Sequence, residues 1–205
     1  ETCKIALFSY PKESDQIHYL NQKDFEIKFI KQYIDLLGIR ERILPIERLE
    51  NYEIGSAIIY ENFHRVRGVK RVPDENIKNI RDFSLGMKDK DFPVYKKIYA
   101  ARKGLRTISQ EAESMILSHG FEKLYMEDFS VLEQATIFNN ADVIVSPHGA
   151  QLANLIFCKD QSRIIELSNG CNYTCFPDTA IKVMGGCHSS QRGNPNNALD
   201  TFYLG

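Results

Sequence analysis

The sequence predicts an α/β fold built around a parallel β-sheet. Short β-branched apolar runs, of which Val143–Val145 is the clearest, are typical of strands buried on both faces. Segments of helical periodicity lie between these runs, with capping residues at their ends. A strand ends at Ser146-Pro147, and the small residues Gly149 and Ala150 follow before helical spacing resumes. This pattern predicts a strand-to-helix turn whose backbone can approach an anionic ligand closely.

The first part of the chain has the features of a small α/β half. A strongly amphipathic segment opens at Asp24 and ends at Gly38, which predicts a helix with a glycine C-cap. The basic stretch 61–70 is predicted to be a loop-like linker, which makes 1–70 and 71–205 the two domains. The other expected elements here are strands at 4–9, 43–45 and 57–60 and a polar loop at 10–22.

The second part reads as regular βα units. Ser109 and Ser130 are expected N-caps, and Glu133 stands at the capping-box position after Ser130. A last strand, 163–167, carries Glu166 near its end. The other expected elements are a helix opening at Pro73, strands at 97–101 and 123–126, helices at 110–118, 131–140 and 176–184, and a mobile loop at 185–197.

The composition narrows the class of protein. Lys and Arg number 26 against 27 Asp and Glu, so no global field attracts nucleic acid or an anionic membrane. No apolar run is long enough to span a bilayer, so we expect a soluble chain. The five cysteines are odd in number and loosely spaced, which favours a reducing compartment. We therefore expect a cytoplasmic protein, or a protein of the ER or Golgi lumen if the source is eukaryotic.

Two features that resemble metal sites are interpreted otherwise. Cys171, Cys175, Cys187 and His188 are possible zinc ligands, but their spacing fits no common template, so we expect plain thiols in a loop. The stretch Asp89-Lys90-Asp91 has the D-x-D form, but it lies in a charged segment without a strand. The sequence therefore predicts no metal site.

Four blocks of the chain resemble glycosyltransferase family 61, known also through the DUF563 and capsular polysaccharide biosynthesis proteins. The last block is the specific one, because PHGA is followed by LANLIF and by a strand that ends with an acid. Together the blocks span roughly half the chain. They are 98–102 with Arg106, Gly120-Phe121, 132–134, and 147–157 with 165–167.

The resemblance implies a GT-B fold, in which two Rossmann-like halves face each other across a cleft, with the N-terminal, acceptor-side half reduced here. It implies an inverting, metal-independent transferase with a C-terminal nucleotide-sugar-binding half. The donor is expected to be UDP-linked, the acceptor to be a glycan or glycoprotein, and no separate cofactor is expected. The process implied is polysaccharide biosynthesis, and the type of sugar transferred stays open.

Two arginines are expected to bind the donor diphosphate. Sugar transfer requires stabilisation of the developing diphosphate charge, by a divalent metal or by fixed cations and N–H groups. Arg102 follows the strand 97–101, at the sheet edge that carries the His148 turn, and Arg106 follows in the resembling pattern. Arginine binds phosphate oxygens bidentately and keeps its charge. The alternative is that Arg102, Lys103 and Arg106 form a solvated basic loop.

The remaining expected donor contacts cluster around the His148 turn. We predict that His148, with Gly149 and Ala150, contacts the donor through a hydrogen bond, and that His148 is not the general base. Glu166 is assigned to ribose or base hydroxyls, with a buried ion pair to an arginine as its alternative. Gln134 and Asn154 are assigned to the donor site as well, although either can buttress the loop instead.

The catalytic base is not identified. His18, His64, Glu61 and Asp15 are candidates only because the acceptor is expected on the first domain. One rival hypothesis is a catalytically inactive nucleotide-sugar-binding domain. A second, a Rossmann-type dinucleotide oxidoreductase, is disfavoured because no G-x-G-x-x-G opens any predicted βα unit.

Overall fold

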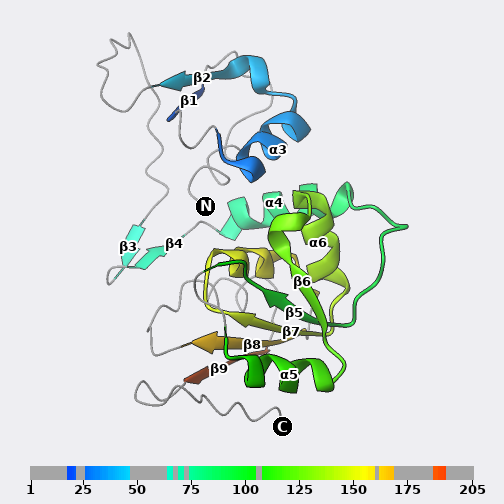
Figure 1. Cartoon of the computed structure of the whole chain (residues 1–205). Helices are drawn as coiled ribbons and strands as arrows, with labels where there is room; N and C mark the ends of the chain where they lie inside the picture. Colours follow the sequence, from blue (N-terminus) through cyan, green and yellow to red (C-terminus); the bar gives the residue numbers. More distant parts are fainter. Residues whose placement is uncertain are drawn as a thin grey trace. The chain divides into compact units, whose positions relative to one another are not determined.

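The computed structural model describes residues 18–21, 26–46, 64–66, 69–71, 74–104, 108–159, 162–168 and 187–192 (Figure 1). The chain divides into two compact units, Glu1–Ile80 and Arg81–Gly205. The predicted strands at 4–9 and 57–60 and the predicted helix at 176–184 lie outside the described residues. The domain boundary at residue 70 stays a prediction.

The first unit contains a βαβ arrangement. Strand β1 (His18–Asn21) pairs in parallel with β2 (Ile43–Ile46), and helix α3 (Lys28–Leu37) lies between them in the chain. The predicted loop at 10–22 is therefore wrong at 18–21, where pairing with β2 makes a strand. The apolar stripe of α3 buries Ile30, Tyr33 and Ile34. Gly38 ends the helix in the left-handed conformation, with φ at 64°, as predicted. A short 3-10 helix, η1 (Arg40–Arg42), leads into β2.

The predicted linker at 61–70 is wrong in part, because it contains paired strands. Strand β3 (His64–Val66) is antiparallel to β4 (Val69–Arg71), with Val66 opposite Val69. The pairing also places His64 opposite Arg71 and Arg65 opposite Lys70. Basic residues predominate in this stretch, so its sequence resembles a solvated loop more than a pair of strands. Helix α4 (Asp74–Gly86) follows, at the predicted start.

The second unit is built on a five-stranded parallel sheet in the order β6-β5-β7-β8-β9. Chain order runs outward from β5, so the direction of the crossovers reverses between β5 and β7. In open parallel sheets, ligands bind beyond the carboxyl ends of the strands at such a switch point. The strands are β5 (Lys97–Ala101), β6 (Glu122–Tyr125), β7 (Val143–Pro147), β8 (Arg163–Ser168) and β9 (Cys187–Arg192).

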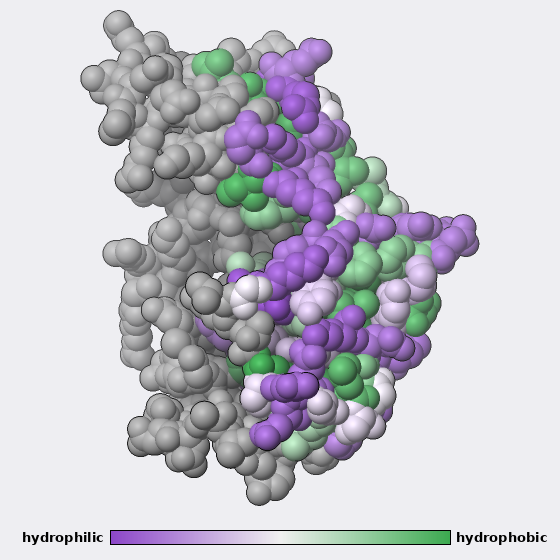
Figure 2. Space-filling model, viewed as in Figure 1, coloured by the Kyte–Doolittle hydropathy of each residue, from purple (hydrophilic) through white to green (hydrophobic). Residues whose placement is uncertain are grey.

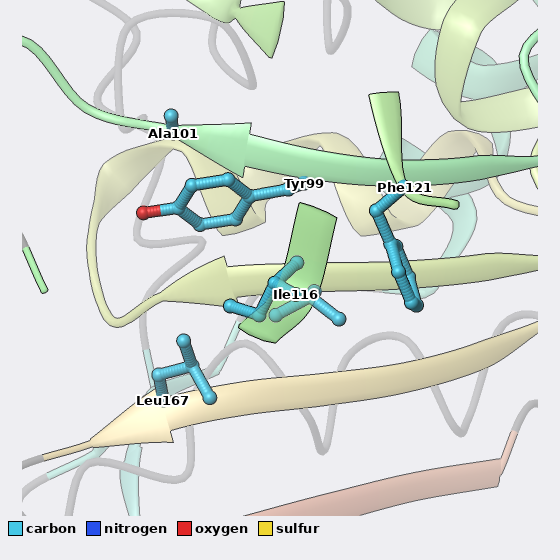
Figure 3. Packing of buried hydrophobic residues seen from close by; sticks show 6 residues of the cluster. Tyr99, Ala101, Ile116, Phe121 and Leu167 are labelled. Carbon is cyan, nitrogen blue, oxygen red and sulfur yellow. The ribbon is translucent and has the colours of Figure 1, made fainter. Parts of the chain in front are cut away.

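Helices cover the two faces of this sheet (Figure 1). Helix α5 (Gln110–Ser118) lies on one face, and α6 (Val131–Asn140) packs with the 3-10 helix η3 (Ala150–Phe157) on the other. A further 3-10 turn, η2 (Met126–Asp128), joins β6 to α6. On the α5 side, Tyr99, Ile116, Phe121 and Leu167 converge in a buried cluster (Figure 3). The predicted α/β class is therefore confirmed.

Local predictions for this unit are largely confirmed. Strand β5 and helices α5 and α6 have the predicted bounds. The Ser130 hydroxyl accepts from the Glu133 N–H at 3.2 Å, while the Glu133 carboxylate accepts from the Ser130 N–H at 2.6 Å. This is the predicted capping box. The D-x-D stretch is a loop, in which the Asp91 N–H donates to the Asp89 side chain at 2.9 Å.

Two local predictions for the second unit differ from the structure. Residues 185–197 were expected to form a mobile loop, yet 187–192 form β9, paired with β8 along its length. The sequence Cys-His-Ser-Ser-Gln-Arg has no β-branched residue, so only pairing with β8 makes it a strand. The helix after His148 is a 3-10 helix of eight residues, longer than such runs usually are.

Hydrophilic and hydrophobic residues intermingle on the visible face of the described residues (Figure 2). Exposed large hydrophobic side chains include Met115 and Leu117 on α5. None of the helices in the described part of the chain has the length and apolar character needed to cross a bilayer.

Candidate functional site

The site lies at the carboxyl ends of β5 and β7, where the two strands stop pairing. Their backbone pairing ends at Tyr99 opposite Val145. Beyond that pair, β5 continues beside β6 to Ala101, and β7 continues beside β8 to Pro147. The carboxyl ends of the two strands at the switch point therefore do not pair with each other. Side-chain hydrogen bonds connect them in place of backbone hydrogen bonds.

Gln151 links the two strand ends. Its Nε2 donates to the Ala100 carbonyl oxygen at 2.7 Å and to the Ser146 hydroxyl at 2.6 Å. The Ser146 hydroxyl in turn donates to the Pro147 carbonyl oxygen at 3.0 Å. One amide therefore ties β5 to β7 just below the turn. Sequence reasoning missed Gln151 and Ser146, and the only available signal was that Gln151 is polar directly after the turn.

The Arg102 guanidinium lies against the Gly149 backbone. Its Nη1 donates to the His148 carbonyl oxygen at 3.4 Å, a long contact. A Cβ on Gly149 would collide with Nη1 and would lie 3.0 Å from Cζ. Gly149 has an extended backbone, with φ at 162°, so the site requires glycine here for space and not for its conformation.

The same guanidinium carries an unsatisfied donor. Arg102 Nε is the one buried side-chain nitrogen or oxygen, within the described part of the chain, that has no hydrogen-bond partner. Buried polar groups in proteins are nearly always paired, so this donor is available to a water molecule or a ligand. Lys103, the next residue, is instead ion-paired with Asp128, and this bond raises the pKa of the exposed lysine.

His148 is held at three points. Its N–H donates to the Leu167 carbonyl oxygen at 2.9 Å, and its own carbonyl oxygen accepts from Arg102. Its Nδ1 is bonded to Oε1 of Glu166. The His148 side chain is 18% exposed and that of Glu166 only 4%. Glu166 thus has an imidazole as a partner, whereas the sequence suggested sugar hydroxyls or an arginine, and its assignment to ribose stays a prediction.

Gln134 and Asn154 form a separate hydrogen-bond network between α6 and η3. The Asn154 amide donates to Oε1 of Gln134 at 2.8 Å. Gln134 Nε2 donates to the carbonyl oxygens of Met126 and Phe129, at 2.8 and 3.1 Å. Asn154 is 5% exposed. These contacts join η3 to α6 and to the turn before it, so the geometry favours the buttressing alternative for both residues.

The far end of η3 is also fixed by side chains. Arg81 Nη1 donates to the carbonyl oxygens of Ile156 and Cys158, at 2.5 and 2.7 Å. Asn139 donates to the carbonyl oxygen of Phe157 at 2.9 Å. These donors satisfy carbonyls that a helix C-terminus leaves without partners. Anchored at both ends, η3 holds the His148 turn in place.

The structure does not describe the side chains of several predicted site residues. Arg106, Glu61 and Asp15 lie outside the described residues, and of His18 and His64 only the backbone, in β1 and β3, is described. The same holds for Cys187 and His188 in β9, whereas Cys171 and Cys175 fall in an undescribed stretch. Where side chains are described, His, Cys, Asp and Glu form no cluster of three or more suited to a metal ion.

Cys158 has the properties of a structural thiol. It is buried at the end of η3, and burial raises its pKa to about 12. The thiolate, not the thiol, is the nucleophile and metal ligand. Cys158 therefore stays protonated at neutral pH and contributes no chemistry to the site.

Comparison with known families assigns the chain. The sequence model of the family described as Glycosyltransferase 61 matches residues 12–165, about three quarters of the 205 residues. The chain belongs to glycosyltransferase family 61, which confirms the resemblance drawn from the sequence. No curated protein matches the chain. The family match covers Arg102, His148 and Gly149, and it implies a sugar donor and an acceptor.

Proposed function

We propose that this protein transfers a sugar from a nucleotide-sugar donor to a glycan or glycoprotein acceptor, and that the donor diphosphate binds at the β5/β7 switch point. The observation that supports this most directly is the Arg102 guanidinium, which lies on Gly149 with a buried Nε that has no partner among the described residues. Membership of a glycosyltransferase family supports sugar transfer as the reaction. The proposal includes a UDP-linked donor and the GT-B arrangement.

The chemistry of the leaving group fits this place. As the glycosidic bond to the donor breaks, negative charge develops on the diphosphate, and preorganised cations and N–H groups stabilise it. Arg102 supplies a guanidinium with five N–H donors. One of them, on Nη1, makes a long bond to the His148 carbonyl oxygen. Parallel sheets bind phosphates at this position because the carboxyl ends of the strands and the loops after them converge there.

We propose that the transfer needs no metal ion and proceeds with inversion. Arg102 supplies charge stabilisation of the kind that a divalent cation supplies in other transferases. The acceptor hydroxyl needs a base, and His18, His64 and Glu61 of the first unit stay our proposed candidates. Gln134 and Asn154 hold η3 against α6, and they support the donor site without contacting the donor.

Isothermal titration of the protein with UDP in the presence of EDTA tests the proposal. We expect one UDP per chain, with no binding of NAD. Binding that EDTA abolishes and manganese restores would overturn the metal-independent mechanism, and binding of NAD in place of UDP would favour an oxidoreductase. Turnover of UDP-sugars with glycan acceptors completes the test, because binding without any turnover would indicate a nucleotide-sugar-binding domain.

A further inference from the structure

We infer that Glu166 is a positioning residue for His148, and that it makes His148 Nε2 an acceptor for a hydroxyl group of one of the two substrates. The inference rests on the proposed function, since it assigns a ligand group within the same site. It changes the expected role of His148, because the sequence predicted that the imidazole donates a hydrogen bond to the donor.

The bond between His148 and Glu166 determines which ring nitrogen carries the proton. An ionised carboxylate can only accept hydrogen bonds, and Oε1 of Glu166 is bonded to Nδ1 of His148. A carboxylate has no proton to donate, so the proton in this bond is carried by Nδ1 of the ring. The neutral ring therefore has its proton on Nδ1 and its lone pair on Nε2.

The ring is held in one orientation. The backbone N–H of His148 is bonded to Leu167, its carbonyl oxygen to Arg102 and its side chain to Glu166. Glu166 is itself buried in β8, beside Ser146 of β7. With 18% of its side chain exposed, His148 still reaches the surface at the switch point. Such preorganisation is typical of a side chain that contacts a ligand with defined geometry.

The tautomer determines whether the group that binds Nε2 of His148 must donate or accept a hydrogen bond. Oxygens of an ionised diphosphate accept hydrogen bonds, and so does an unprotonated Nε2, so a neutral His148 in this tautomer cannot bond to them. A sugar hydroxyl can donate to Nε2. Arg102 then binds the phosphate, whereas His148 binds a hydroxyl of the donor sugar or of the acceptor.

The tautomer is measured without any ligand by nitrogen-15 NMR of the histidine rings. We expect Nδ1–H for His148 in the wild type and a shift of the population toward Nε2–H in Glu166→Gln, with recovery in Glu166→Asp. The His148→Asn spectrum assigns the resonance among the five histidines. His119 is an internal control, because its Nδ1 lies 2.8 Å from the Met115 carbonyl oxygen, and its signals should not change in Glu166→Gln. An Nε2–H tautomer of His148 in the wild type, or a ring protonated on both nitrogens, would overturn the inference, because Nε2 would then be a donor.

The hydroxyl is located by titration of His148→Ala and Glu166→Gln with UDP and with the UDP-sugar that turns over. We expect UDP affinity within about twofold of the wild type in both variants. A loss of about tenfold for the UDP-sugar alone would place the hydroxyl on the donor sugar. Unchanged donor affinity with turnover reduced at saturating donor would place it on the acceptor.

Two results of the same titration would contradict the inference. One is an equal loss of affinity for UDP and for the UDP-sugar, which would show a phosphate contact. The other is unchanged binding and turnover in His148→Ala. Absence of UDP binding to the wild type would instead refute the proposed function, and the NMR measurement would still test the pairing of Glu166 with His148. Thermal melting of each variant shows whether it is folded.

Discussion

Two polar clusters, one made by Gln134 and Asn154 and the other by Arg102 and the His148 turn, differ in how fully their hydrogen bonds are satisfied. In the buttress cluster, Gln134 and Asn154 bond to each other and to backbone carbonyls at 2.8 to 3.1 Å. In the edge cluster, Arg102 makes one long bond of 3.4 Å and has a buried Nε without a partner among the described residues. Both clusters were assigned to the donor from the sequence.

The difference separates residues that build the site from residues that face a ligand. A buried polar group that is fully paired contributes to stability, and removing its partner costs a desolvation penalty. A buried donor that makes no bond within the described fold can bond to a ligand. We therefore expect the buttress cluster to affect mainly unfolding, and the edge cluster to affect mainly donor binding.

The largest effect is expected from Arg102→Ala. A hydrogen bond to a charged group contributes about 1.5–3 kcal/mol, so the affinity for UDP should fall about ten- to a hundredfold. Arg102→Lys is the matched control, because it keeps the charge but not the planar fork, and it should recover only part of the affinity. Isothermal titration measures both variants. Wild-type affinity in Arg102→Ala would place the diphosphate elsewhere.

Asn154→Ala should act on stability. It leaves Oε1 of Gln134 without its donor, and an unsatisfied buried group costs about 1–3 kcal/mol. We expect the free energy of unfolding in urea to fall by about that amount, while UDP affinity of the folded protein stays near the wild-type value. A large loss of UDP affinity with unchanged stability would make Asn154 a donor contact, as first assigned.

Gly149→Ala tests the contact between the turn and Arg102. The new Cβ collides with the guanidinium, which must move. UDP affinity should fall by about tenfold although no polar group is lost. In the double variant with Arg102→Ala the two losses should not add, because residues in contact are energetically coupled. Additive losses would indicate that Gly149 acts independently of Arg102.

Ser130→Ala is expected to have the smallest effect and serves as a control for general destabilisation. It removes the capping box of α6, which costs about 1 kcal/mol of stability. Urea unfolding should show this loss, and titration should show unchanged UDP affinity. If affinity fell as well, changes of binding in the other variants could reflect stability alone.

Local signals in the sequence were sufficient for much of the sheet unit. The capping box at Ser130 and Glu133 and the apolar run of β7 are determined by neighbouring residues, so their bounds were predicted. The placement of Arg102 and His148 at one sheet edge followed from parallel strands ending on the same side. The family was predicted from the block around His148.

Contacts between distant residues were beyond the sequence. Gln151 bonds to Ala100, which lies 51 positions away, and nothing local distinguishes it from a surface glutamine. The bond between His148 and Glu166 depends on strands β7 and β8 being adjacent and in register. Strand β9 is polar, and pairing with its neighbour alone makes it a strand. Each of these features depends on which strands the sheet places side by side.

The central claim is that Arg102 binds the donor diphosphate, and a comparison of UDP with uridine tests it most directly. Uridine lacks both phosphates, so the ratio of the two affinities isolates what the phosphates contribute. We predict that UDP binds the wild type much more tightly than uridine does. In Arg102→Ala most of this difference should vanish, while uridine affinity is unchanged. If Arg102→Ala lowers both affinities equally, or neither, Arg102 does not bind the diphosphate.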